Sequence, residues 1–112
     1  MEFSIQPVVD GQTTTLYVAG EVDLATAGEL RQAAFIALDA GATELIIDLY
    51  KVTFLDSTGL AVLVALNNQT TDTGAHLTVR GSSPRVLKVM RITGLDKVLP
   101  LEANPNPGDP PQ

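Results

Sequence analysis

The sequence contains no cysteine, and this absence excludes a disulfide framework, a thiolate metal site and a cysteine nucleophile. Stability must therefore come from the packing of apolar side chains. The 112 residues are 45% hydrophobic, which is enough to form the core of one globular domain. We expect a single domain over residues 1–100, followed by a proline-rich, polar tail over residues 101–112 that we predict to be disordered.

Long apolar runs are missing as well. No segment reaches the roughly 18 to 20 consecutive apolar residues that a membrane-spanning helix requires. The opening segment MEFSIQPVVDG also lacks the basic start and the apolar stretch of a signal peptide. The sequence therefore predicts a cytoplasmic protein that does not attach to a membrane.

Basic residues are scarce. Seven Lys and Arg residues stand against thirteen Asp and Glu residues, which gives a formal charge of -6. The resulting electrostatic field repels nucleic acid and anionic lipid, so the composition argues against direct DNA binding. Any part in gene regulation would have to act through another protein.

A β-hairpin is expected at the start of the chain. Residues 3–9 and 13–20 have the partial alternation of short strands, and Asp10 and Gly11 between them tolerate the positive φ angles of a tight turn. A helix should follow, because Thr26 and Glu29 have the spacing of a capping box ahead of apolar residues at helical intervals.

The rest of the chain alternates strands with helices. The expected order is a strand over residues 44–49, a loop over 52–59, a helix from Leu60 that Gly74 ends, a strand over 76–79, and a helix between Ser83 and Gly94. Strands joined through helices pair in parallel by right-handed crossovers, whereas the strands of a hairpin are antiparallel. We therefore predict an α/β fold with a mixed β-sheet, in which an N-terminal antiparallel hairpin precedes β-α-β-α units and the helices pack on the sheet.

One segment, Phe54–Leu60, carries polar residues in an unusual place. Asp56, Ser57 and Thr58 lie between an apolar strand and an apolar helix. Such loops, at the carboxyl ends of strands, are where α/β proteins place their sites. A purely structural interpretation is also open, in which Asp56 or Ser57 caps the helix that follows.

Motifs of catalysis are absent from the sequence. Ser57 lies in L-D-S-T-G rather than in G-x-S-x-G, and the only histidine, His76, opens a predicted strand. No glycine-rich phosphate-binding motif occurs. Asp48 ends a predicted strand, as the phospho-accepting aspartate of a response-regulator receiver does, but the acidic pair that would hold Mg²⁺ is missing. We predict that the protein is not an enzyme, needs no cofactor and binds no metal.

Two motifs together carry a resemblance to a known family. The segments G-E-V-D-L-A-T-A-G-E-L and F-L-D-S-T-G-L resemble the STAS domain of bacterial anti-sigma factor antagonists. The similarity extends over residues 3 to 100 and includes G-S-S-P-R-V and I-T-G-L-D-K-V-L. It implies a STAS-like fold and a role in the regulation of a sigma factor.

The resemblance also implies a partner-switching cycle. The unphosphorylated protein would bind an anti-sigma factor that is also a serine kinase, and so release a sigma factor. Phosphorylation of Ser57 would inactivate it, and a PP2C-type phosphatase would restore it. Thr58 stays open as a second acceptor of the phosphate.

The matching positions give a predicted partner surface, which consists of Asp23, Asp56, Ser57, Thr58 and Gly59. For Asp23 we expect a free carboxylate, because Thr26 and Glu29 should cap the first helix without it. We expect a monomer or a weak dimer. The alternative function is that of a non-catalytic STAS scaffold within a larger signalling assembly.

Overall fold

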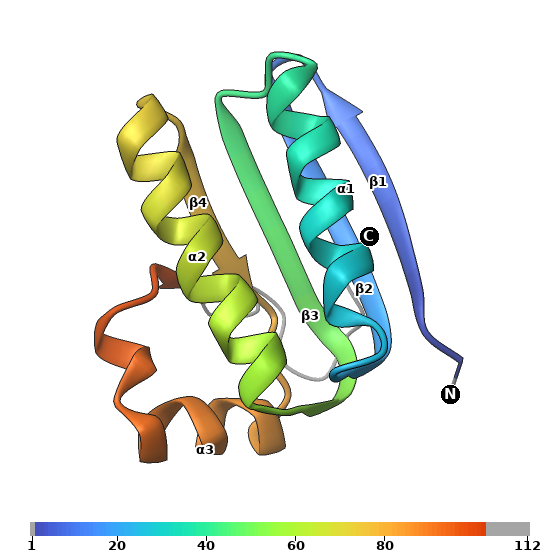
Figure 1. The fold of residues 1–112 in the computed structure, drawn as a ribbon, viewed down its shortest axis with the longest axis vertical. Helices are drawn as coiled ribbons and strands as arrows, with labels where there is room; N and C mark the ends of the chain where they lie inside the picture. The colour runs from blue at the N-terminus through green and yellow to red at the C-terminus, as the bar shows by residue number, and fades with distance from the viewer. Residues whose placement is uncertain (1, 103–112) are drawn as a thin grey trace.

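The computed structural model describes residues 2–102, which form one mixed sheet with helices packed against it (Figure 1). The strand order is β1-β2-β3-β4-β5, in which β1 and β2 are antiparallel and the other neighbours are parallel. The strands are β1 (Ser4–Asp10), β2 (Thr13–Val22), β3 (Glu44–Leu55), β4 (His76–Arg80) and β5 (Leu101–Glu102). The helices are α1 (Ala27–Asp39), α2 (Ser57–Thr73), α3 (Pro84–Thr93) and the short 3-10 helix η1 (Leu95–Lys97). The predicted fold class is confirmed.

The hairpin between β1 and β2 turns on Gly11. Asp10 pairs with Thr13, so Gly11 and Gln12 form a two-residue loop and Asp10 remains in the strand. Gly11 has a φ of 62°, and no non-glycine residue in the described part of the chain has a positive φ. One positive φ at the first loop position is the requirement of a type II′ turn. The turn therefore depends on Gly11 alone rather than on the predicted Asp10-Gly11 pair.

The core lies between the sheet and the two longer helices, α1 and α2, which cross the same face of the sheet in Figure 1. Alternate residues of the central strands point into it, as the two-residue period of a strand requires. Alanines on the buried side of α1 let that helix approach the sheet closely. The largest fully buried side chains are Leu16, Val18 and Val22 of β2, Leu45, Ile47, Leu49 and Val52 of β3, Val79 of β4, Leu30 of α1, Leu63 and Leu66 of α2, and Met90 of α3.

Strand β3 is longer than predicted. It runs to Leu55 rather than to Leu49, and α2 begins at Ser57, three residues before the expected Leu60. Two irregularities in the pairing of β2 with β3 insert an extra residue into β3 each time. Each insertion shifts the alternation of apolar and polar residues, so the sequence pattern of a strand is lost after residue 49 although the pairing continues.

The C-terminal end of the sheet extends beyond the predicted domain boundary at residue 100. Leu101 and Glu102 pair with Val79 and Arg80 of β4. Residues 103–112 of the predicted tail lie outside the described residues. None of the helices within residues 2–102 is both long enough and apolar enough to cross a membrane.

A core substitution tests the packing of α2 on the sheet. Leu63 is fully buried, so we expect Leu63→Ala to lower the free energy of unfolding by about 2 to 5 kcal/mol in urea denaturation. The matched control is Leu24→Ala, which truncates an exposed leucine and should change that free energy by less than about 0.5 kcal/mol. Equal losses in the two variants would contradict the assignment of the core.

Candidate functional site

The candidate site lies where β2 and β3 end together. Val22 and Leu55 are paired at the carboxyl ends of these two parallel strands, so the loops that follow them are neighbours. The backbone N–H of Asp56 donates to the carbonyl oxygen of Val22 at 3.1 Å. This hydrogen bond holds the start of α2 against the end of β2. The segments that carry Asp23 and Ser57 are thereby brought to the same end of the sheet.

Gly59 makes this close approach possible. A Cβ atom at this position would lie 2.6 Å from Cδ1 of Leu55, 2.9 Å from Cγ1 of Val22 and 3.1 Å from the carbonyl oxygen of Val22. Real Cβ atoms do not approach backbone and branched side chains at such distances, so any larger residue would push α2 away from the sheet. Gly59 is buried, and the structure gives it a packing role. Its contribution to a partner surface stays a prediction.

Asp56 caps α2. Its backbone is extended, and its Oδ1 accepts a hydrogen bond from the N–H of Gly59 at 3.0 Å. This is the standard geometry of an N-cap carboxylate, which satisfies one of the free donors in the first turn. The structural interpretation of the D-S-T-G segment is therefore confirmed for Asp56. Ser57 is the first residue of the helix and is exposed, whereas Thr58 is half-buried.

The loop between β2 and α1 is closed by Asp23. Its Oδ1 accepts from the backbone N–H groups of Ala25 at 3.0 Å and Thr26 at 3.2 Å. The Thr26 hydroxyl accepts from the N–H of Asp23 at 3.0 Å and donates to the carbonyl oxygen of Glu21 at 2.8 Å. The predicted capping box was wrong, because Thr26 makes no side-chain cap and turns back toward the loop. The prediction of a free Asp23 carboxylate was also wrong, because its Oδ1 accepts hydrogen bonds from the N–H groups of Ala25 and Thr26.

Two exposed apolar side chains belong to the same end of the sheet. Leu24 is 81% exposed and follows directly on Asp23, and Phe54 is 43% exposed and pairs with Glu21 in the sheet. Neither residue is among the site residues predicted from the sequence. The position of Leu24 could have indicated its exposure. An apolar residue inside a tight turn closed by an Asp side chain cannot reach the core and stays at the surface.

The other polar residues considered from the sequence lie elsewhere. Asp48 is buried and forms an ion pair with Arg80, in which Nε of Arg80 lies 3.1 Å from Oδ2. Its Oδ1 accepts from the N–H of Tyr50 at 3.0 Å. Leu55 stands seven positions after Asp48 along β3, which is a distance of about 23 Å. His76 is exposed at the start of β4, and residues 2–102 contain no group of three or more side chains suited to a metal.

Comparison with known proteins places the chain in a family. The family model described as "Mlab, STAS domain" matches residues 5–101. The anti-sigma-B factor antagonist of Bacillus subtilis is 33% identical over 91 residues, which cover 81% of this chain and 83% of the relative. The protein of the same name from Listeria monocytogenes is 32% identical over 87 residues, which cover 78% and 76%. The chain belongs to the STAS domain family.

A solved structure supports the same assignment for this STAS domain. An anti-sigma factor antagonist from Mycobacterium paratuberculosis has a TM-score of 0.81 and 29% identity, over 95% of this chain and 88% of that chain. The family predicted from the D-S-T-G-L and G-E-V-D-L segments is confirmed. In this STAS domain the two segments meet through the pairing of Val22 with Leu55, although more than thirty residues separate them in sequence.

Removal of the α2 cap tests the local geometry of the STAS domain. We expect Asp56→Ala to lower the free energy of unfolding by about 1 kcal/mol, because the N–H of Gly59 loses its acceptor. The matched control is Asp72→Ala near the other end of α2. An acid there opposes the helix dipole, so its removal should be neutral or slightly stabilising. Equal destabilisation of both variants in urea denaturation would contradict the capping role.

Proposed function

We propose that this STAS domain is an anti-sigma factor antagonist switched by phosphorylation of Ser57. The unphosphorylated form binds an anti-sigma factor that has serine kinase activity, and this binding releases a sigma factor in the cytoplasm. Phosphorylation of Ser57 ends the binding, and a PP2C-type phosphatase restores it. The observation that carries the proposal is the exposed Ser57 hydroxyl at the first position of α2, in a chain whose relatives are named anti-sigma-B factor antagonists. This role requires no catalysis by the STAS domain itself.

The exposure of the two hydroxyls favours Ser57 as the acceptor. A kinase must bring its bound ATP in line with the attacking oxygen, which requires an accessible side chain. Ser57 is exposed, whereas Thr58 is half-buried on the following position of the helix. Because the cap of α2 is supplied by Asp56, modification of Ser57 leaves the capping hydrogen bond in place.

The position of Ser57 explains how a phosphate can act without unfolding the domain. A phosphoserine carries about -1.5 to -2 charges near neutral pH, and the N-terminus of a helix stabilises negative charge through its dipole and its free N–H groups. The fold therefore tolerates the modification. At the surface, the new charge stands beside the carboxylates of Asp56 and Asp23, which already make this end of the sheet acidic.

The apolar residues around Ser57 supply the binding energy that the phosphate removes. Leu24 and Phe54 are exposed next to the site and are suited to fill pockets on a partner. A few buried apolar anchors carry most of the energy of a protein interface, at about 2 kcal/mol or more each. A strongly hydrated dianion between such anchors prevents the close packing that they need. The loss of one or two of them weakens binding by roughly 30-fold or more.

The proposed phosphorylation is tested by intact mass measurement with site mapping. Wild-type protein incubated with ATP and the anti-sigma kinase of the same genome should gain one phosphate at Ser57. Ser57→Ala should gain none and should stay bound to the kinase, whereas Thr58→Ala should be phosphorylated like the wild type. A phosphate mapped to Thr58 would contradict the assignment of the acceptor. Kinase binding without phosphorylation would favour a STAS scaffold instead of a switch.

The apolar anchor is tested separately by its effect on affinity. We expect Leu24→Ala to weaken binding to the anti-sigma factor by about 10-fold or more, measured by titration calorimetry, because a leucine in an interface loses most of its contact area. Val8→Ala shortens an exposed side chain in the middle of β1, away from the loops that carry Asp23 and Ser57, and should leave the affinity unchanged. Unchanged affinity of Leu24→Ala would exclude Leu24 as an anchor of the interface.

A further inference from the structure

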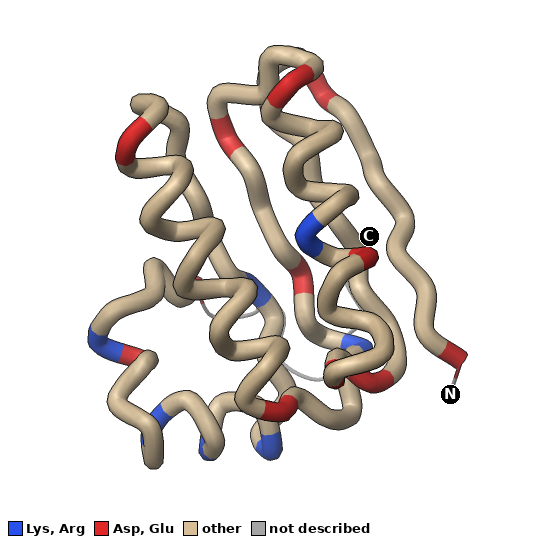
Figure 2. Tube along the Cα trace, viewed as in Figure 1, with Lys and Arg blue, Asp and Glu red and all other residues tan. Residues whose placement is uncertain are grey.

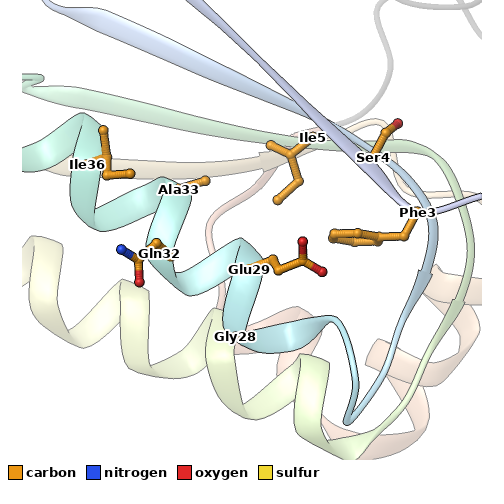
Figure 3. A pocket seen from close by; sticks show the side chains of 8 residues that line it. All are labelled: Phe3, Ser4, Ile5, Gly28, Glu29, Gln32, Ala33 and Ile36. Atoms are coloured by element: carbon orange, nitrogen blue, oxygen red, sulfur yellow. The ribbon is translucent and has the colours of Figure 1, made fainter.

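An apolar groove runs between β1 and α1. It consists of two hollows of about 450 and 470 Å³ that share Ala33 and Ile36 in their lining, so we treat them as one β1–α1 groove. Figure 3 shows Phe3 and Ile5 turned toward Glu29 and Ala33 of the helix. The groove exists because α1 packs over β2 and leaves part of the same face of the edge strand β1 uncovered (Figure 1).

The groove is exposed and lies in an acidic half of the molecule. Ile36, on the wall of the groove that α1 forms, is 61% exposed. Val9, on the wall that β1 forms, is 70% exposed. Residues 2–40 hold one basic residue, Arg31, whose guanidinium lies 5.3 Å from the ring centre of Phe35. The acids of the same segment, which are red in Figure 2, are Glu2, Asp10, Glu21, Asp23, Glu29 and Asp39.

A surface of opposite charge is formed by α3. Arg85, Lys88 and Arg91 are three of the seven basic residues of the chain, and all three are exposed. Arg85, Lys88 and Ile92 are spaced by three and four residues, which places them on one face of the helix. Ile92 is 75% exposed. We call Arg85, Lys88, Arg91 and Ile92 the α3 patch; Lys and Arg are blue in Figure 2, and several blue segments lie along α3.

We propose that a second copy of this chain docks its α3 patch into the β1–α1 groove. The two surfaces are complementary, because Ile92 can enter an apolar groove in whose lining, within residues 2–102, Glu29 is the one charged residue, and Glu29 attracts the flanking Arg85 and Lys88. The interface is heterologous, since it joins two different surfaces, and it builds head-to-tail chains or closed rings. Pairing of two grooves with each other is disfavoured, because it would bring acid against acid.

The edge of β1 disfavours a different mode of association. An exposed edge strand commonly recruits a further strand through its free N–H and carbonyl groups. Pro7 stands in the middle of β1 and has no N–H to offer, and proline in a strand is a recognised protection of an edge. Docking of a helix patch into the groove uses side chains and does not require the strand edge.

The proposed association is independent of the proposed switch. Neither the β1–α1 groove nor the α3 patch contains Asp23, Asp56, Ser57, Thr58 or Gly59. Association and binding of an anti-sigma factor therefore fail or succeed separately. Opposite charges at a surface attract over roughly 10 Å at 0.1 M salt and over roughly 3 Å at 1 M, so the association should weaken as salt rises.

Sedimentation velocity of the full chain over a range of concentrations tests the proposal. At about 0.1 M salt the weight-average sedimentation coefficient should rise with concentration, and about 1 M salt should shift the association constant down by 10-fold or more. Ile36→Glu in the groove and Ile92→Glu in the α3 patch should each reduce self-association by at least 10-fold. The control is Val8→Glu, which adds the same charge on β1 but faces the opposite side of the sheet, and it should associate like the wild type.

A mixture of the two defective variants gives the decisive outcome. Ile36→Glu retains its α3 patch and Ile92→Glu retains its groove, so an equimolar mixture can form one intact interface and should yield dimers that grow no further. An interface between two grooves could not be restored in this way, because Ile36→Glu has no intact groove to contribute. Wild type that stays monomeric at all concentrations, or a mixture that shows no recovery, would overturn the proposal.

Discussion

The contact between the end of β2 and the first turn of α2 is the constraint on which the site depends. The N–H of Asp56 donates to the carbonyl oxygen of Val22, and Gly59 leaves no room for a Cβ between Val22 and Leu55. These two features fix where the helix begins and in which direction it leaves the sheet. They also place the exposed Ser57 beside the loop of Asp23 and Leu24. The phosphate proposed for Ser57 would therefore stand at the surface, outside the contact between β2 and α2.

The fold could be predicted where local chemistry decides the structure. Gly74 and Gly94 end their helices in the left-handed conformation, and Ser83 caps α3 by accepting from the N–H of Val86 at 3.3 Å, as the sequence indicates. The order of strands and helices follows from the same signals. The prediction was wrong where one side chain can form either a helix cap or a turn. Asp23 and Thr26 both favour turns and caps, and only the geometry of the loop shows that Thr26 bonds back to Glu21 instead of capping α1.

The remaining differences between the predicted and the observed structure depend on which strands are neighbours in the sheet. The extension of β3 to Leu55 depends on its partner β2, because the irregularities that keep the two strands paired hide the alternation in the sequence. The candidate site was predictable at Asp56 and Ser57, where three polar residues interrupt an apolar context. Leu24 and Phe54 were not found. The turn that Asp23 closes would have indicated an exposed Leu24, but that turn was not recognised from the sequence, and Phe54 has no comparable signal. The burial of Asp48 with Arg80 likewise requires knowledge that β3 and β4 are neighbours.

The proposed switch at Ser57 is best tested by comparing affinity before and after phosphorylation. Protein phosphorylated stoichiometrically at Ser57, and the same preparation without phosphate, would be titrated into the anti-sigma factor of the same genome, with a thermal melt of each form. We expect tight binding of the unphosphorylated form, at least about 30-fold weaker binding of the phosphorylated form, and melting temperatures that agree within a few degrees. Equal affinities would contradict the switch, and loss of the folded state on phosphorylation would contradict the claim that the phosphate acts at the surface.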